Sequence, residues 1–158
     1  MGERIDYLDD SAAPKANSLV PSANVIVVND QGEILMIRRT DNDNWAVPGG
    51  GMDLGESITD AATRETKEET GIACEITGLV GIYTNPRHVI RYTSNDEVRQ
   101  EFSIVFTARP VGGVLRPSSE SSDPQWVSPA TVPSLRMHPS MRQRIQHYLD
   151  KRAAPYLG

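Results

Sequence analysis

A short stretch of the sequence gathers four glutamates and one arginine at spacings that can do chemistry. A helix is expected over residues 57–70, and it places Glu65, Glu68 and Glu69 on one face because positions i, i+3 and i+4 are neighbours on a helix. Like charges at this spacing repel one another. A divalent cation is the natural counter-charge, since Mg²⁺ prefers carboxylate oxygens and shares its remaining sites with phosphates. The cluster therefore points to metal-assisted phosphate chemistry, with a merely solvated acidic face as the alternative, and the surrounding residues decide in favour of the first.

The residues around the acidic stretch give the expected helix a defined start and end. Three glycines at 49–51 precede it and let the backbone approach a ligand or metal closely. Ser57 is expected to cap the N-terminus together with Asp60, three residues on. Gly71 stands where helices commonly end in a left-handed cap. The acidic face is therefore predicted to be free for a ligand.

The order and spacing of these residues resemble the signature motif of the Nudix hydrolase family. The motif reads Gly50, five residues, Glu56, seven residues, Arg64-Glu65, two residues, Glu68-Glu69, one residue and Gly71-Ile72. One position departs from the pattern: Thr66 stands where the family normally has an aliphatic residue. The resemblance covers residues 23–150 and predicts that the chain is a Nudix hydrolase.

This resemblance implies a reaction and a metal. The expected reaction is hydrolysis of a diphosphate bond in a nucleoside diphosphate that is joined to another group. Glu65, Glu68 and Glu69 would hold Mg²⁺, with Mn²⁺ as the alternative ion, and the backbone carbonyl of Gly50 is implied to join the metal shell. Metal ions lower the pKa of bound water, so hydroxide could attack phosphorus. Arg64 is expected to orient the cluster by pairing with Glu68 or Glu56.

A general base or further metal ligand often comes from outside this motif in the family. Glu120 is the first candidate, because it lies in a Ser-rich loop six residues before Trp126, an offset shared by some MutT-like relatives. Glu101, which enters a predicted strand at 102–109, is its rival. For each residue the alternative is an ordinary charge at a loop or strand end.

Three residues outside the motif are candidates for binding the substrate. Arg39 would pair with phosphate oxygens, Tyr83 would stack on a base, and Arg87 would contact a phosphate or ribose. Each also has a structural alternative as a strand-end, packing or loop residue. A proline about fifteen residues after the motif is frequent in ADP-ribose pyrophosphatases of this family, and Pro86 has that spacing. ADP-ribose or a similar derivative is therefore the leading predicted substrate.

Three alternatives to this function stay open. The first is a MutT-like nucleoside triphosphate pyrophosphatase of the 8-oxo-dGTP type. The second is a Nudix domain that senses a nucleotide without hydrolysing it, although a complete glutamate set argues against that reading. The third is an RNA 5′-end hydrolase, which the net charge of −5 disfavours because nucleic-acid binding usually relies on a basic surface.

Beyond the motif, the chain of 158 residues is expected to form one domain. An N-terminal arm at 1–20 is predicted to be loose or to lie on a neighbouring subunit, followed by the Nudix domain at 21–152 and a tail at 153–158. The resemblance implies an α/β/α sandwich with a mixed β-sheet between helices. A lone cysteine and the absence of an export signal or membrane-length apolar run predict a cytoplasmic protein. A small nucleotide is the expected partner, with no DNA and no membrane, and the resemblance admits a homodimer.

Apolar patterns outside the motif predict further strands and one more helix. Strands are expected at 23–28 and 34–39, joined as a hairpin, and at 74–84, 102–109 and 125–127. The helix is expected to begin at Pro139 and to carry an apolar stripe. Its charged residues, Arg144 among them, are assigned to the opposite face. His138 and His147 are interpreted as surface residues that do not form a metal site.

Overall fold

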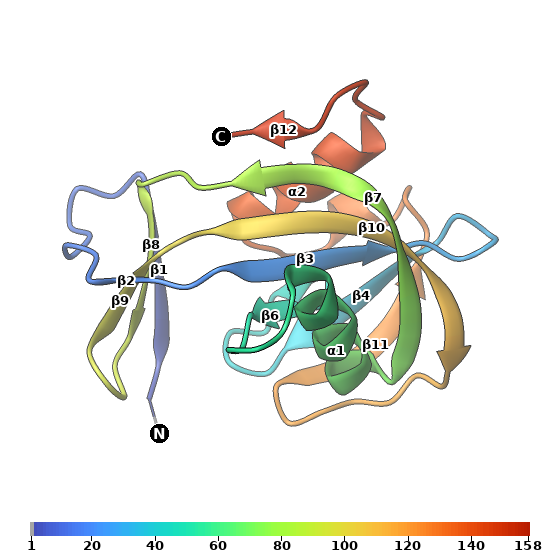
Figure 1. Ribbon diagram of the computed structural model, residues 1–158, viewed down its shortest axis with the longest axis horizontal. Helices are drawn as coiled ribbons and strands as arrows, with labels where there is room; N and C mark the ends of the chain where they lie inside the picture. The colour runs from blue at the N-terminus through green and yellow to red at the C-terminus, as the bar shows by residue number, and fades with distance from the viewer. Residues whose placement is uncertain (1) are drawn as a thin grey trace.

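The computed structural model describes residues 2–158 and has three sheets and two α-helices among them (Figure 1). The helices are α1 (Ile58–Thr70) and α2 (Pro139–Leu149), and a short 3-10 helix spans Val132–Ser134. The strands are β1 (Arg4–Leu8), β2 (Ser18–Leu19), β3 (Ser22–Val27), β4 (Ile34–Arg39), β5 (Trp45–Ala46), β6 (Gly49–Gly51), β7 (Ile72–Tyr83), β8 (His88–Tyr92), β9 (Glu97–Gln100), β10 (Ser103–Gly113), β11 (Ser121–Val127) and β12 (Tyr156–Leu157).

The largest sheet is mixed, as the resemblance implied. Its strand order is β12-β7-β10-β3-β6, with β10 parallel to β3 and antiparallel to β7. A three-stranded sheet has the order β11-β4-β5. The third sheet, β1-β8-β9-β2, stands at the left of Figure 1 and contains the first strand of the chain.

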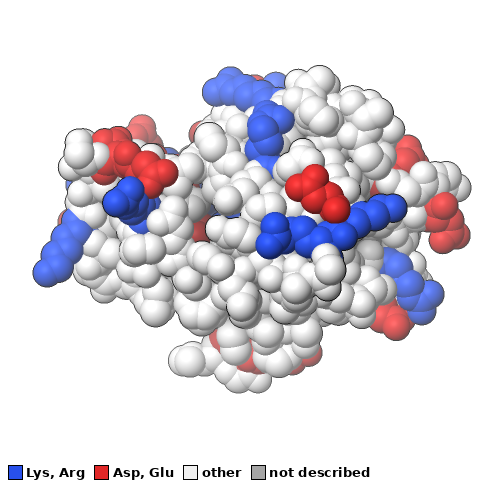
Figure 2. Space-filling view, turned by 90° about the horizontal axis from the view of Figure 1, so that it is seen from above, with Lys and Arg blue, Asp and Glu red and all other residues white. Residues whose placement is uncertain are grey.

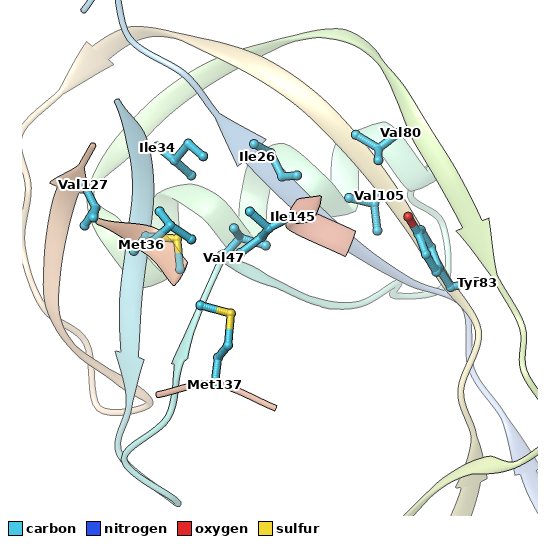
Figure 3. Close-up of a cluster of buried hydrophobic side chains, with 11 residues drawn as sticks. Ile26, Ile34, Met36, Val47, Val80, Tyr83, Val105, Val127, Met137 and Ile145 are labelled. Carbon is cyan, nitrogen blue, oxygen red and sulfur yellow. The ribbon is translucent and has the colours of Figure 1, made fainter. Parts of the chain in front are cut away.

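Alternating side chains along β3 explain how the helices cover both faces of the sheet. Val25 and Val27 belong to the same buried cluster as Ala62 of α1. Ile26, between them, belongs instead to the cluster that contains Ile145 of α2 (Figure 3). Successive side chains of a strand point to opposite faces, so α1 and α2 bury the two sides of one strand. The predicted α/β/α sandwich is confirmed, with α1 in front of the strands and α2 behind them in Figure 1.

Both ends of α1 follow the sequence prediction. The Ser57 side chain accepts from the backbone N–H of Asp60, and the Asp60 carboxylate accepts from the N–H of Ser57, which completes the capping box. At the other end Gly71 adopts φ 81°, and its N–H donates to the carbonyl of Lys67. The local signals of the motif therefore fix the length of the helix that carries the glutamates.

We expect Gly71→Ala to destabilise the protein more than Gly32→Ala. Both glycines have positive φ, 81° and 76°, and a β-carbon there costs about 1–2 kcal/mol. A β-carbon at Gly71 would also meet the carbonyl oxygen of Val114, whereas nothing lies within 4 Å of one at Gly32. The Gly71 loss should therefore reach about 3 kcal/mol or more. Urea unfolding of the two variants measures the difference in their free energies of unfolding. Equal losses would show that the backbone at Val114 moves aside at no cost in stability.

The predicted hairpin at 23–39 is only partly formed. Between β3 and β4 the turn closes with the N–H of Gly32 donating to the carbonyl of Asn29 at 2.9 Å. Only one bridge, Val28 with Ile34, then joins the two segments among the described residues. The strands separate because β3 pairs with β10 and β6, whereas β4 pairs with β11 and β5. Pairing with distant strands thus outweighs the local hairpin.

The N-terminal segment packs against its own chain. β1 is antiparallel to β8 along its whole length, and β2 is parallel to β9. At the other end of the chain, β12 adds to the edge of β7. The first strand therefore belongs to the wall of the molecule and takes part in the cleft described below.

Arg144 is placed differently from the prediction, which assigned it to the exposed face of the last helix. Its residue is only 5% exposed. The guanidinium Nη1 donates to Asn24 Oδ1 at 2.5 Å, and its carbon lies 5.1 Å from the centre of the Tyr83 ring. The expected stripe of α2 is nevertheless confirmed, since Ile145 is fully in the core and Met141, Tyr148 and Leu149 pack against it.

The surface carries charges of both signs. The face in Figure 2 shows Lys and Arg beside Asp and Glu on a largely uncharged background. Within residues 2–158, no helix has the length and apolar character needed to cross a membrane.

Candidate active site

The glycine strand β6 and the helix α1 bring the predicted metal ligands together. A β-carbon at Gly50 would overlap the carboxyl group of Glu65, so that carboxyl rests directly on the glycine backbone. The N–H of Gly49 donates to Glu69 Oε2 at 3.2 Å. Antiparallel pairing of β6 with β3 holds the glycines in place. The structure thus places Gly50, Glu65 and Glu69 side by side, while the Glu68 side chain is more exposed and pairs with Arg64.

The electrostatics of these glutamates fit a cation. Glu69 is 7% exposed, and burial, followed by the charges of Glu65 and Glu120, raises its pKa to about 8. Burial also raises the pKa of Glu65, and Glu68 and Glu120 add to the effect. The glycine backbone thus holds the carboxyl groups of Glu65 and Glu69 close together. Their oxygen atoms form a possible donor set for a metal ion. Such a set matches the preference of hard divalent ions.

Arg64 pairs with both partners that the sequence left open. Its Nε and Nη2 donate to the two carboxylate oxygens of Glu56 at 3.0 and 2.6 Å. Its Nη1 donates to Glu65 at 3.0 Å and to Glu68 at 3.2 Å. Hydrogen bonding to Glu56 is the main reason why the pKa of Arg64 is raised, and the same bond lowers the pKa of Glu56 to about 2. With Asp53 at 3.4 Å, one guanidinium therefore pairs with four carboxylates and orients Glu65 and Glu68.

The two candidate bases occupy different places. Glu120 lies at the start of β11, in a loop joined to α1 by a hydrogen bond of 2.7 Å from Ser121 Oγ to the carbonyl of Glu69. Its charge adds to the raised pKa values of Glu65 and Glu69, so it acts on the cluster electrostatically. Glu101 is 8% exposed and lies 3.8 Å from Arg144 Nη2. Glu120 accordingly stays the candidate base, and Glu101 belongs to the wall of the neighbouring cleft.

A cleft of about 140 Å³ adjoins the glutamates. Its lining includes Glu69 and the glycines of β6, together with Arg39, Trp45 and Glu101. Arg39 is the predicted substrate residue that the structure places here, and its guanidinium pairs with Asp41 at 2.6 Å. A phosphate in the cleft could compete with Asp41 for that guanidinium.

Two other predicted substrate residues lie elsewhere. Tyr83 is 5% exposed, stacks on His147 and Tyr156 at centroid distances of 5.8 and 5.0 Å, and shares a hydrogen bond of 2.8 Å with His147 Nδ1. Its ring is therefore part of the core in Figure 3 and is not free to stack on a base. The Arg87 side chain is 78% exposed and does not line the cleft. The sequence around Pro86 does not indicate that Tyr83 is buried in the core or that Arg87 is exposed outside the cleft.

The sequence analysis missed the wall of the cleft that the third sheet provides. Alternate residues of β8, namely His88, Ile90 and Tyr92, line the cleft, as do Arg4 and Asp6 of β1. The period of two in HVIRY is the signal that could have identified this strand face. His138, interpreted as a surface residue, also lines the cleft and stacks on His88 with ring centroids 5.3 Å apart. Apart from Ile90 these side chains are polar or aromatic, so hydrophobic patterns did not reveal them.

Comparisons with known proteins agree with this geometry. A family model described as the NUDIX domain matches residues 18–148. A MutT-like protein of Streptomyces ambofaciens is 38% identical over 125 residues, which are 79% of this chain and 73% of that protein. An 8-oxo-dGDP phosphatase of Mus musculus is 36% identical over 121 residues, 72% of this chain and 34% of that protein. An ADP-ribose pyrophosphatase of Methanocaldococcus jannaschii is 30% identical over 112 residues, 69% of this chain and 62% of that protein.

A solved structure supports the same fold. A Nudix hydrolase from Nitrosomonas europaea superposes with a TM-score of 0.68 and is 20% identical. The similarity covers 87% of this chain and 93% of that one. The overall fold is therefore shared with a protein whose sequence differs at most positions.

Proposed function

The chain belongs to the Nudix hydrolase family, and from this premise we propose that it hydrolyses the diphosphate bond of a nucleoside diphosphate derivative, with ADP-ribose as the leading substrate. The family acts on diphosphate bonds with divalent metal, and Mg²⁺ is the ion we propose here, with Mn²⁺ as the alternative. The observation that carries the proposal is that the partly buried Glu65 and the buried Glu69 lie against the backbone of Gly50 and Gly49. Burial is the main cause that raises the pKa of both carboxyl groups, and perturbed pKa values of this kind are typical of functional sites.

The residues of the site divide the work between them. Glu65, Glu68 and Glu69, with the Gly50 carbonyl, would hold the metal, which supplies a water of lowered pKa and neutralises the diphosphate. Arg64 positions this set through its bonds to Glu56, Glu65 and Glu68. Glu120, whose charge acts on the pKa values of these glutamates, is the candidate base that accepts a proton as water attacks phosphorus. A phosphorus–oxygen bond then breaks, and Arg39 is proposed to hold a phosphate of the substrate in the cleft.

A second substrate class has support of its own. The Streptomyces relative is MutT-like, and the mouse relative acts on 8-oxo-dGDP by name, and both are more similar to this chain than the ADP-ribose pyrophosphatase is. Oxidised purine nucleotides are therefore the alternative substrates.

Tyr83 and Arg87 do not line the cleft, so they are withdrawn from the proposed contacts. A homodimer stays a prediction from the resemblance.

A hydrolysis panel with product identification tests the proposal. We expect Mg²⁺-dependent cleavage of ADP-ribose to AMP and ribose 5-phosphate with the highest kcat/KM. Release of pyrophosphate from 8-oxo-dGTP, or of phosphate from 8-oxo-dGDP, with a higher kcat/KM would favour the alternative. Canonical nucleoside triphosphates and dinucleoside polyphosphates complete the panel. No metal-dependent turnover of any of these would overturn the proposed function.

A further inference from the structure

A second cluster of metal-ligating side chains lies in the cleft and contains none of the Nudix glutamates. Asp6 comes from β1, His88 from β8, and His138 immediately precedes α2. Each offers one ligand atom, and these atoms all lie within 4.8 Å of one another. We propose that Asp6, His88 and His138 form a binding site for a transition-metal ion of the Zn²⁺ class.

The donor set determines the class of ion. Two imidazoles and one carboxylate suit Zn²⁺ and similar first-row ions, whereas Mg²⁺ prefers oxygen ligands. His88 Nε2 already lies 3.4 Å from Asp6 Oδ1. Ligand atoms bonded at about 2.0–2.1 Å around a tetrahedral ion lie roughly 3.4 Å apart, so this pair has the required separation. The ligand atom that His138 offers lies within 4.8 Å of the other two.

An oxygen atom lies near Nδ1 of each histidine, within hydrogen-bond distance for His138 and at 4.0 Å for His88. His138 Nδ1 lies 2.7 Å from Ser140 Oγ and accepts from the backbone N–H of Ser140 at 3.2 Å. Binding of a metal through Nε2 therefore requires the other tautomer, in which Nδ1–H donates to Ser140 Oγ. His88 Nδ1 faces Glu101 Oε2 at 4.0 Å, on the side of the ring opposite its contact with Asp6. Histidines that bind metals usually have an oxygen partner at the other ring nitrogen, which orients the ring.

A neighbouring cation limits the affinity. Arg4 contacts both carboxylate oxygens of Asp6 at 3.3 Å. This contact orients the carboxylate but opposes a positive ion by its charge. Binding is therefore expected to be weaker than at structural zinc sites that have thiolate ligands. All three proposed ligands line the cleft, so an ion with three protein ligands keeps its remaining position open to a group bound there.

Titration of the whole protein with Co²⁺ as a spectroscopic probe, followed by displacement with Zn²⁺, tests the site. We expect one equivalent of Co²⁺ to give visible absorption bands typical of low-coordinate nitrogen and oxygen ligation. Zn²⁺ should remove these bands and raise the melting temperature in a concentration-dependent manner. His138→Ser should abolish both effects while its hydroxyl still caps α2. His147→Ser, which removes a histidine outside the cluster, should leave them unchanged.

Two further variants make the test decisive. Asp6→Asn should weaken Zn²⁺ binding at least tenfold, which provides an answer if His138→Ser does not fold. Glu69→Gln should retain the Co²⁺ bands, because the proposed site does not use the Nudix glutamates. Failure of the hydrolase proposal can therefore be distinguished from failure of the Asp6–His88–His138 site. The proposal would be overturned if Zn²⁺ does not bind saturably at sub-millimolar concentration, or if binding survives both His138→Ser and Asp6→Asn. The contact between Asp6 and His88 would then be structural only.

Discussion

Replacement of Glu69 with Gln is expected to lower kcat/KM by about a hundredfold or more while the protein stays folded. A metal site can contribute several kcal/mol to a reaction, and about 1.4 kcal/mol corresponds to a tenfold change in rate. Gln removes the negative charge but keeps an oxygen that can accept from the N–H of Gly49, as Glu69 does now at 3.2 Å. The fold of α1 and β6 should therefore survive. Steady-state kinetics at saturating Mg²⁺ and circular dichroism together measure the two outcomes.

The same substitution should change how the metal-free protein responds to pH. Burial raises the pKa of Glu69 from its ordinary 4.5 to about 8, so the folded state holds a proton that the unfolded state releases. Stability in EDTA should thus be complete below about pH 4.5 and fall as the pH rises towards about 8. Glu69→Gln should remove this part of the decline, because the amide does not titrate. Urea midpoints across this range measure it.

Glu75→Gln provides a matched control for Glu69→Gln. Glu75 lies on β7, its side chain is 59% exposed, and it pairs with Arg109 at 2.9 Å. Exposed ion pairs contribute little, so neither activity nor the pH dependence of stability should change. Wild-type activity in Glu69→Gln would remove Glu69 from the proposed metal ligands, whatever the pH series shows.

The region around α1 could be predicted because its signals are local. The capping pair Ser57 and Asp60, the left-handed Gly71 and the i, i+3, i+4 spacing all act within one helix. Short-range geometry of this kind follows from spacing alone. The α/β/α arrangement came from the resemblance, and the alternation along β3 explains why the structure adopts it.

The cleft wall could not be predicted in the same way. β8 pairs with β1, more than 80 residues earlier in the chain, through segments such as HVIRY that are largely polar or charged. Hydrophobic runs identify strands that are buried on a face, but these strands present polar side chains to a cleft. His138 was placed on the surface because its contact with His88 depends on where α2 begins relative to the third sheet. The position of the start of α2 relative to the third sheet is known only from the folded structure.

Arg144 shows the same limit within a correctly predicted helix. Its partner Asn24 is 120 residues away, and the pattern of α2 alone assigns a charged residue to solvent. Buried guanidinium groups are normally fully hydrogen-bonded. Here, Nε of Arg144 is buried and has no partner among the described residues. The sequence therefore predicts helix α2, but it does not predict that the charged Arg144 side chain is buried at a cost in stability.

Substituting Met for Arg144 is expected to destabilise the protein by about 3 kcal/mol, since removing one member of a buried charge pair leaves the other uncompensated. The other member is Glu101, which is 8% exposed and 3.8 Å from Arg144 Nη2. Met retains much of the apolar contact with Tyr83, so the loss should come mainly from the charge. Urea unfolding at pH 7 measures it.

A double-mutant cycle separates this charge effect from lost packing. In the Arg144→Met background, Glu101→Gln should recover most of the stability, because no buried carboxylate then lacks its cation. In the wild-type background the same Gln substitution should destabilise, since it leaves Arg144 without its acidic neighbour. Simple additivity of the two losses would mean that Arg144 and Glu101 do not stabilise each other. The destabilisation would then come from the hydrogen bond to Asn24, which Asn24→Ala should reproduce.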